Sequence, residues 1–338
     1  MRKKECQMMH LGIIGTNWIT HQFVEAALAT KEYQLTAVYS RKLATAEEFG
    51  SRYGEVVCET DLDEFVHLPE VDVIYIASPN SLHFSQAKAA ILANKHVIVE
   101  KPAFSTPEEM VEIMTLANEK NVLFFEAARN IHEDNFKKVK KLLPPLEEVI
   151  GANFSYMKYS SRYDAVLAGE EPNIFSPTFS GGSLADLGVY PVYASVAWFG
   201  MPKEVHHFAR KIATGVDGIG TVILRYENFD VTIQHGKIGD SFLPSEIYTT
   251  TKTFVLSSVN AINHVTIHQR ADHTVEEIPL HVEENPMIEE ARVFAAIMQN
   301  PTVHHEAYQE LLTLAQGVNL LLYKMRKQVD VSYAADKE

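Results

Sequence analysis

The first 126 residues alternate short β-rich runs with longer helical patterns, and this alternation restricts the possible folds more than any other feature. The run Val71–Ala77 (VDVIYIA) is almost continuously apolar, as expected for a strand buried on both faces of a sheet. Strands that alternate with helices through short connections form parallel sheets with right-handed crossovers. Residues 1–126 are therefore predicted to form a doubly wound α/β domain. The expected strands are His10–Ile14, Gln34–Tyr39, Val56–Cys58, Val71–Ala77, His96–Glu100 and Val122–Glu126.

After residue 127 the pattern changes to strands that follow one another without helices between them. Thr221–Tyr226 and Val231–His235 flank a short polar segment, which predicts a hairpin and antiparallel pairing. Two closing helices, Met287–Met298 and His305–Lys327, carry apolar residues at helical spacing. Residues 127–338 are therefore predicted to form a second α/β domain, in which helices cover one side of a sheet.

Composition and charge exclude several classes of protein. Hydrophobic residues make up 46% of the chain and charged residues 22%, which is typical of a globular protein in water. The sequence contains no apolar run long enough to cross a bilayer and no apolar stretch typical of a signal peptide. Cys6 and Cys58 are too few for a disulfide framework, which indicates a reducing compartment. We therefore expect a cytoplasmic protein without a membrane partner.

The formal net charge of −14 disfavours binding to a phosphate-rich polymer. The densest basic cluster has no interleaved aromatic residues and is typical of a solvated helix face. Its members are Lys137, Lys138, Lys140 and Lys141. No nucleic-acid partner is expected, although a dinucleotide would need only a local positive site.

A glycine-containing turn lies between the first expected strand and the first expected helix. A dinucleotide site at this place needs a tight turn and amides directed from a helix N-terminus. Gly15 supplies the turn, and Asn17 stands where a second glycine would be expected, because asparagine tolerates left-handed backbone angles. A plain strand–helix turn is the structural alternative. The candidate cofactor-binding residues here are Gly12, Gly15, Thr16, Asn17, Trp18 and Ile19.

The end of the second strand indicates which dinucleotide is preferred. NAD-binding sites usually have an acidic residue there, but this chain has Ser40 and Arg41 followed by Lys42. A hydroxyl group and cations suit the additional phosphate of NADP. NADP(H) is therefore favoured and NAD(H) remains possible, whereas the structural alternative is a loop with ordinary surface charges.

Five motifs occur in a fixed order along the chain. They are Gly12-Ile-Ile-Gly15, Ser40-Arg41, Ala77-Ser-Pro-Asn80-Ser-Leu-His83, His96-Val-Ile-Val-Glu100-Lys101-Pro102 and Gly181-Gly-Ser-Leu-Ala-Asp186-Leu-Gly188-Val-Tyr190-Pro191. Together they resemble the Gfo/Idh/MocA family, which includes glucose–fructose oxidoreductase and inositol dehydrogenase, and the resemblance covers nearly the whole chain. Its most specific part is the Glu-Lys-Pro sequence after a β-rich run, together with Asp and Tyr four residues apart. Many relatives have histidine where this chain has Tyr190, whereas the branch that resembles dihydrodiol dehydrogenase and glucose–fructose oxidoreductase has tyrosine.

The resemblance implies an N-terminal Rossmann domain and a C-terminal domain with a large, open, mostly antiparallel sheet. It also implies a homodimer or homotetramer that assembles through that sheet. Lys101 would be catalytic and would border the nicotinamide, and the Lys101–Pro102 bond could be cis. The other residues implied to line or adjoin the cofactor are Ser78, Pro79, Asn80, His83 and Glu100.

Hydride transfer to or from a carbon that bears oxygen requires a proton to move as well. Tyr190 could donate or accept this proton, and the ammonium of a nearby Lys101 would favour its phenolate form. Asp186, four residues before Tyr190 in a helical pattern, would orient the substrate or the lysine. Each residue has a structural alternative: Asp186 could complete a helix cap, Tyr190 could belong to the core, and Lys101 could be solvated.

The expected substrate-binding residues are Lys101, Arg162, Asp186 and Tyr190. Arg162 belongs to a segment, Tyr156–Tyr163, that is rich in the hydroxyl groups and cations a sugar or polyol would use.

No metal site is expected. Four histidines were considered as ligands, but His264 and His268 would lie about 13 Å apart along one strand. The histidines are His235, His264, His268 and His273.

The predicted function is hydride transfer between NAD(P) and a sugar, polyol or similar hydroxy or carbonyl compound. The alternatives are a catalytically inactive protein that senses dinucleotides and a redox-neutral enzyme that uses tightly held NAD.

Overall fold

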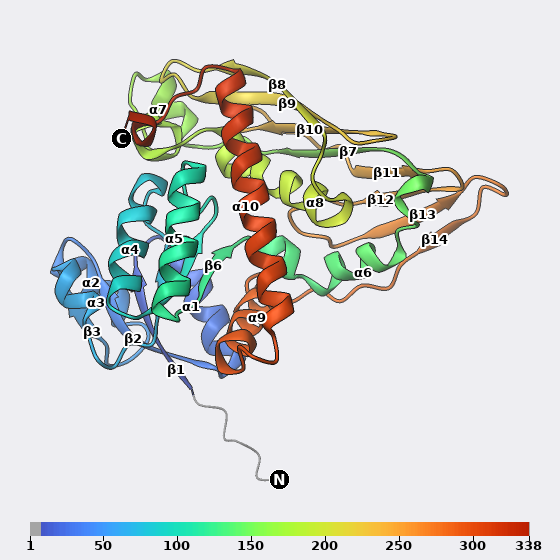
Figure 1. Ribbon diagram of the computed structural model, residues 1–338. Helices are drawn as coiled ribbons and strands as arrows, with labels where there is room; N and C mark the ends of the chain where they lie inside the picture. The colour runs from blue at the N-terminus through green and yellow to red at the C-terminus, as the bar shows by residue number, and fades with distance from the viewer. Residues whose placement is uncertain (1–7, 338) are drawn as a thin grey trace, which may run out of the picture. The chain divides into compact units, whose positions relative to one another are not determined.

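The computed structural model describes residues 8–337 and divides them into two compact units (Figure 1). Cys6 lies outside the described residues, and Cys58 is a free thiol. A segment late in the chain, Glu283–Ala315, belongs to the first unit together with most of the residues before 128. The first unit comprises the described residues up to Phe104, Glu108–Ala127 and Glu283–Ala315, and the second comprises Ser105–Pro107, Ala128–Val282 and the residues from Gln316 onward.

The sheet of the first unit has six parallel strands in the order β3-β2-β1-β4-β5-β6. The direction in which strands are added reverses between β1 and β4, which is the arrangement of a doubly wound sheet. The predicted fold of this part is confirmed. The strands are β1 Met9–Ile14, β2 Tyr33–Tyr39, β3 Val57–Glu59, β4 Val73–Ile76, β5 His96–Glu100 and β6 Phe124–Ala127.

Apolar residues of this sheet face two separate cores because both of its faces are covered. On β4, Tyr75 belongs to one core together with Phe23 and Phe294, whereas Ile74 and Ile76 belong to the other. Burial on both faces explains why the β4 segment is so continuously apolar. The helices of the first unit are α1 Trp18–Thr30, α2 Leu43–Gly50, α3 Leu62–Val66, η1 Asn80–Leu82, α4 His83–Leu92, α5 Pro107–Lys120 and α9 Ile288–Gln299.

The sheet of the second unit has eight strands in the order β14-β13-β12-β11-β7-β10-β9-β8. All neighbouring strands pair antiparallel except β7 and β10, which are parallel, so the predicted mostly antiparallel sheet is confirmed. The strands are β7 Val149–Met157, β8 Glu204–Lys211, β9 Asp217–Arg225, β10 Asp230–Gly236, β11 Ser245–Thr249, β12 Lys252–Leu256, β13 Val265–Gln269 and β14 Val275–Glu277.

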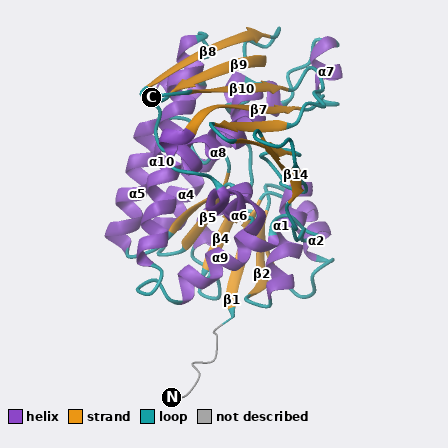
Figure 2. Cartoon of the chain, turned by 90° about the vertical axis from the view of Figure 1, so that its right-hand side faces the viewer, coloured by secondary structure: helices purple, strands orange, loops and turns teal. Residues whose placement is uncertain are grey.

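One face of this sheet is covered by α8 Val189–Phe199, as Figures 1 and 2 show. Phe154 on β7 is fully buried and its ring contacts the Trp198 ring edge-on at 5.7 Å. Thr221, Thr232 and Gln234, which point to the opposite face, are half-buried. The other helical segments of the second unit are η2 Arg129–His132, α6 Asp134–Leu142, η3 Leu146–Glu148, α7 Tyr163–Leu167, η4 Asn173–Phe175, η5 Pro177–Phe179, the π-helical turn η6 Leu184–Gly188 and η7 Ala334–Lys337.

The helix α10 His305–Gln328 contributes its residues up to Ala315 to the first unit and the rest to the second. None of the helices among the described residues has the length and apolar content needed to span a membrane.

Candidate functional site

The candidate cofactor residues follow four neighbouring strands of the first unit at the edge where those strands end. Ile14, the last residue of β1, lies opposite Tyr39 of β2 and Ile76 of β4, and Ile76 lies opposite Val99 of β5. Because the carboxyl ends of parallel strands share one edge, residues far apart in the sequence are brought to it. The segments at this edge are Gly15–Ile19, Ser40–Arg41, Ser78–His83 and Glu100–Lys101.

The turn after β1 lies tightly against the end of β4. Gly15 has a φ of +104°, and a Cβ atom built there would lie 2.7 Å from the carbonyl oxygen of Ala77. A residue with a side chain would therefore be both strained and in collision. The glycine is therefore required by the packing of this turn against β4.

Asn17 caps α1, and the expectation that it has left-handed backbone angles is wrong. Its φ and ψ are −87° and 179°, which is extended backbone. Its Oδ1 accepts hydrogen bonds from the amides of Ile19 at 2.9 Å and Thr20 at 3.3 Å. Its Nδ2 donates to the carbonyl oxygen of Ala77 at 2.9 Å. Asparagine is therefore present because it joins the helix start to the end of β4, not because it tolerates a positive φ.

The surroundings of this turn suit an anionic ligand. The first turn of α1 contains no acidic residue, so its positive dipole end is not neutralised by a side chain. Arg41 is exposed and forms no ion pair with a described residue, and the adjacent Ser40 is half-buried. Trp18 is exposed at the start of α1. These residues fit a phosphorylated dinucleotide.

The buried ring of His83 lies between carbonyl oxygens of two loops at this edge, and in its neutral form it has one N–H to donate. Its Nε2 lies 2.8 Å from the carbonyl oxygen of Ser78, and its Nδ1 lies 3.3 and 3.2 Å from those of Pro102 and Ala103. Burial lowers the pKa of His83 to about 4, so the imidazole is neutral at pH 7. The fully buried side chain positions the loop that carries Lys101.

The loop after β5 is held from two further directions. The Lys101–Pro102 bond is cis, as the resemblance suggested. The amide of Ala103 donates to Oε1 of Glu126 at 3.0 Å. Glu100 is buried and accepts a hydrogen bond from the Tyr75 hydroxyl at 2.6 Å. Glu100 and Glu126 thus fix the backbone on both sides of Lys101.

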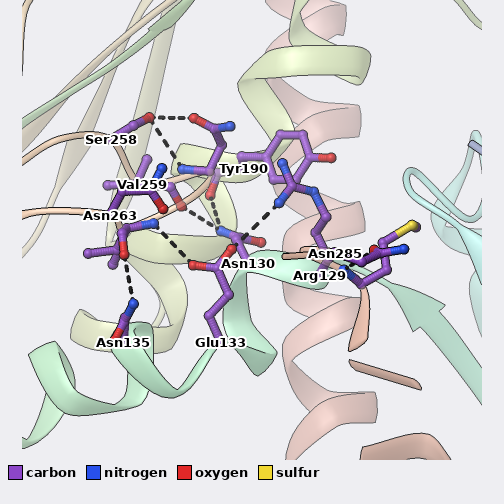
Figure 3. Close-up of polar contacts among 12 residues, drawn as sticks. Arg129, Asn130, Glu133, Asn135, Tyr190, Ser258, Val259, Asn263 and Asn285 are labelled. Atoms are coloured by element: carbon purple, nitrogen blue, oxygen red, sulfur yellow. Dashed lines mark hydrogen bonds and ion pairs between the residues drawn. The ribbon is translucent and has the colours of Figure 1, made fainter. Parts of the chain in front are cut away.

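In the second unit, Tyr190 lies in the first turn of α8, and its ring is next to the guanidinium of Arg129 (Figure 3). The central carbon of the Arg129 guanidinium lies 5.6 Å from the centre of the Tyr190 ring, and the ring contacts Tyr156 edge-on at 5.7 Å. Nη1 of Arg129 lies 3.5 Å from a carboxylate oxygen of Glu133. Tyr190 is buried to 8% exposure, so its ring is fixed by packing.

Asn130 joins the backbone of Tyr190 to the loop between β12 and β13 (Figure 3). Its Nδ2 donates to the carbonyl oxygens of Tyr190 at 3.3 Å and Val259 at 3.0 Å. On the same loop, the amide of Ile262 donates to Glu133 at 3.1 Å. Sequence reasoning did not identify Asn130 or Glu133 as site residues. The polar residues Arg129, Asn130 and Glu133, which follow β6 closely, were the signal that could have indicated them.

Asp186 lies in the π-helical turn η6 and forms an ion pair with Lys237. The amide of Leu184 at the start of η6 donates to Asp217 at 2.6 Å, so that amide is bound by a residue of β9 and not by Asp186. The regular α-helical spacing assumed between Asp186 and Tyr190 is wrong, because the π turn precedes α8. Lys237 was not identified from the sequence.

A chain of buried polar groups supports the start of η6. Ser183 Oγ lies 2.7 Å from Nδ1 of His235, whose Nε2 lies 3.0 Å from Nε2 of His207. Nδ1 of His207 lies 3.0 Å from the carbonyl oxygen of Met325. Because a carbonyl can only accept, His207 donates from Nδ1, His235 donates from Nε2, and Ser183 donates to Nδ1 of His235. Burial lowers the pKa of both histidines, in agreement with this neutral arrangement.

The structure also places the other residues that the sequence singled out. Arg162 is exposed beside α7, and its guanidinium forms no ion pair with a described residue. His235 has both ring nitrogens hydrogen-bonded, and His264 lies 3.3 Å from Glu277. The described part of the chain contains no group of three or more His, Cys, Asp or Glu side chains arranged to hold a metal ion. Lys101 belongs to the first unit, whereas Asp186 and Tyr190 belong to the second.

Comparison with family models gives two matches. Residues 9–128 match the GFO/IDH/MocA model described as an oxidoreductase family with an NAD-binding Rossmann fold. Residues 148–240 match the model of the GFO/IDH/MocA C-terminal domain. The first match covers the whole six-stranded sheet, and the second covers strands β7 to β10 of the eight-stranded sheet.

Two curated proteins are similar along almost their whole length. The uncharacterized oxidoreductase YgjR of Escherichia coli is 38% identical over 97% of this chain and 99% of its own. The scyllo-inositol 2-dehydrogenase (NADP(+)) IolU of Bacillus subtilis is 38% identical over 98% of this chain and 100% of its own. Among solved structures, the 3-ketoreductase KijD10 of Actinomadura kijaniata, in complex with NADP and TDP-benzene, has a TM-score of 0.80 at 20% identity. It covers 95% of this chain and 98% of its own, and this likeness concerns the fold.

The buried His83 predicts a specific dependence of stability on pH. The unfolded state takes up a proton near pH 6.5, whereas the folded state resists protonation until about pH 4. The stabilising contribution is therefore complete above pH 6.5 and is lost as the pH falls towards 4, by about 3 kcal/mol in total. In urea unfolding between pH 7 and pH 4, the stability difference between the wild type and His83→Gln should shrink by about this amount. The exposed His67→Gln serves as the control, and a pH-independent difference for His83→Gln would contradict the prediction.

Proposed function

Because the chain belongs to the GFO/IDH/MocA oxidoreductase family, we propose that it is an NADP(H)-dependent dehydrogenase or reductase of polyols or sugar-like compounds. It transfers a hydride between the nicotinamide and a carbon that carries a hydroxyl or carbonyl oxygen. The observation that carries this proposal is the edge of the parallel sheet, where the Gly15–Asn17 turn lies beside Ser40 and Arg41. The naming of the similar Bacillus subtilis protein as an NADP(+)-dependent inositol dehydrogenase supports the cofactor and the substrate class.

Each candidate residue has a part in this proposal. The backbone at Gly15 and the N-terminus of α1 bind the pyrophosphate, and Ser40 and Arg41 bind the additional phosphate of NADP. The bound dinucleotide supplies or accepts the hydride. The ammonium of Lys101 holds the reacting oxygen of the substrate, and the hydroxyl of Tyr190 donates the proton to it or removes it.

Asp186 and the positioning groups complete the proposed site. The carboxylate of Asp186 accepts a hydrogen bond from a second hydroxyl group of the substrate, which fixes the orientation of a polyol. His83 keeps the loop of Lys101 in place, and Asn130 keeps the backbone of Tyr190 in place. Arg162 contributes a cation to the edge of the substrate site.

The preference for NADP(H) depends on Arg41. Replacing it by alanine should weaken NADPH binding by about 10- to 100-fold, because a hydrogen bond to a charged group contributes about 1.5–3 kcal/mol. NADH binding should change by less than about threefold, since NADH lacks that phosphate. Fluorescence titration of the cofactor-free protein measures both affinities, and the exposed Arg270→Ala is the matched control. Equal losses for the two cofactors would show that Arg41 does not select the phosphate.

The catalytic role of Lys101 can be separated from folding and cofactor binding. Lys101→Met should lower kcat by at least about 100-fold while the NADPH dissociation constant changes by less than about threefold. Turnover is measured as NADP(+) reduction with scyllo-inositol and related polyols, and the exposed Lys120→Met is the control. A Lys101→Met enzyme with near-normal turnover would remove Lys101 from the mechanism.

We also propose that the protein forms a homodimer or homotetramer in the cytoplasm. The half-buried face of the eight-stranded sheet, with Thr221, Thr232 and Gln234, supports assembly through that face. The free thiol of Cys58 agrees with a reducing compartment, which fractionation of the enzyme activity would test.

Assembly through the sheet predicts a specific effect of a charge placed on it. Thr232→Arg, on the central strand β10, should shift the protein to monomers because an arginine would be buried without a partner. Light scattering coupled to size-exclusion chromatography measures the mass, and Thr36→Arg, at an equally half-buried position on β2 of the other sheet, is the control. Unchanged oligomers in Thr232→Arg would place the interface elsewhere.

A further inference from the structure

The residue after β10, Lys237, forms a buried ion pair that none of the comparisons assigns to the site. We infer that Lys237 is a positioning residue, which holds Asp186 ionised and correctly oriented to bind a hydroxyl group of the substrate. The inference rests on the function proposed above and names a further residue of that same site.

The geometry of the pair is asymmetric. The side chain of Lys237 is 3% exposed, whereas that of Asp186 is 37% exposed. Nζ of Lys237 donates to Oδ2 of Asp186. The cation therefore lies inside the protein and the carboxylate lies at the surface, where a ligand can reach it.

The other neighbours of the ammonium do not neutralise it. Nζ lies 4.9 Å from the centre of the Phe175 ring, a cation–π contact that stabilises the charge in an apolar place. Among the described residues, Lys237 forms an ion pair with Asp186 alone. Asp186 is thus the ion-pair partner of this buried lysine, and the ammonium also acts at longer range on the Asp217 carboxyl, whose pKa is raised by burial and lowered in part by this charge.

Other titratable groups around the pair are already engaged. Burial raises the pKa of the Asp217 carboxyl on β9, whose Oδ2 accepts from the amide of Leu184. His235 on β10 and His207 on β8 belong to the neutral hydrogen-bonded chain that ends at Ser183. Tyr333 donates to the carbonyl oxygen of Gly181 at 2.9 Å. These groups support the backbone of the turn, and of the two carboxyl groups near Lys237 only Asp186 forms an ion pair with it.

The backbone that leads into the turn of Asp186 is closely packed at two glycines. Gly182 has a φ of +129°, and a Cβ atom there would collide with the carboxylate of Asp217. A Cβ atom at Gly181 would lie 2.7 Å from the backbone of Ile174. The π-helical turn that follows widens the helix at Asp186, and single π turns occur frequently at functional sites.

A purely structural role would not require this pair. Burying an ion costs several kcal/mol, and apolar residues of similar volume are often equally stabilising or better. A carboxylate with a fixed cation behind it, by contrast, accepts hydrogen bonds in one orientation. A neutral ligand with several hydroxyl groups, such as a cyclic polyol, has donors suited to it.

The test compares Lys237→Met, Lys237→Arg and Asp186→Asn in the full-length protein with NADP(+) and scyllo-inositol. Lys237→Met should raise KM by at least about 10-fold and lower kcat less. In its pH profile of kcat/KM, the acidic limb should move to higher pH. The reason is that the carboxylate of Asp186 loses the ammonium that favours its ionised form. Lys237→Arg should recover most of the loss. The double variant Lys237→Met/Asp186→Asn should be no worse than Asp186→Asn alone, within about threefold.

The control is Lys203→Met, which removes an exposed lysine that pairs with Glu227 in the same unit. It should leave KM and the pH profile unchanged. NADPH titration and thermal unfolding of every variant report on cofactor binding and folding. If Lys237→Met does not fold, Lys237→Gln, which removes the charge but keeps a hydrogen-bond donor, takes its place in the same comparison with Asp186→Asn.

The outcomes separate this inference from the proposed function. A folded Lys237→Met enzyme with wild-type KM and pH profile overturns the role of Lys237 and leaves the proposed function intact. The same holds if the losses in Lys237→Met and Asp186→Asn simply add, since the two residues would then act independently. A wild-type protein that binds NADPH but turns over no polyol or ketone overturns the proposed function, and the role of Lys237 is rejected with it.

Discussion

The carboxyl ends of parallel strands must meet at one edge of their sheet, and the candidate cofactor site depends on this constraint. The contact between Gly15 and Ala77 shows how closely the strands approach there, because no side chain fits between them. Asn17 adds a hydrogen bond across the same gap. Short loops at the end of β1, β2, β4 and β5 can then present a helix N-terminus, an arginine and a lysine at one edge.

Buried polar groups position the functional residues in both units. A hydrogen bond in a place of low dielectric constant is strong when its partners are satisfied and costly when they are not. His83 uses carbonyl oxygens of two loops, and the chain from Ser183 through His235 to His207 ends on a carbonyl oxygen of α10. Such groups tolerate little displacement, so they fix loops that would otherwise move.

The residues proposed to act on the substrate and the residues that position them differ in how readily the sequence identifies them. Lys101 and Tyr190 stood out because they lie in local motifs with a recognisable order. Asn130 and Lys237 did not, because their partners are far away in the chain: Val259 for Asn130, and Asp186 for Lys237. The strand β7 was not predicted from the sequence, for a related reason. Gly151, Asn153 and Ser155 of β7 have weak strand preferences, and pairing with β10 and β11 stabilises the strand instead.

The sequence alone determined the doubly wound first unit, the mostly antiparallel second sheet and the place of the glycine turn. Those properties follow from periodicity and from local turn chemistry, which act over a few residues. Only the tertiary structure decided that Asn17 caps a helix, that His83 is buried between loops, and that Asp186 has Lys237 behind it. The physical reason is that burial, hydrogen-bond partners and ion pairs depend on groups brought together from distant parts of the chain, which no local pattern contains.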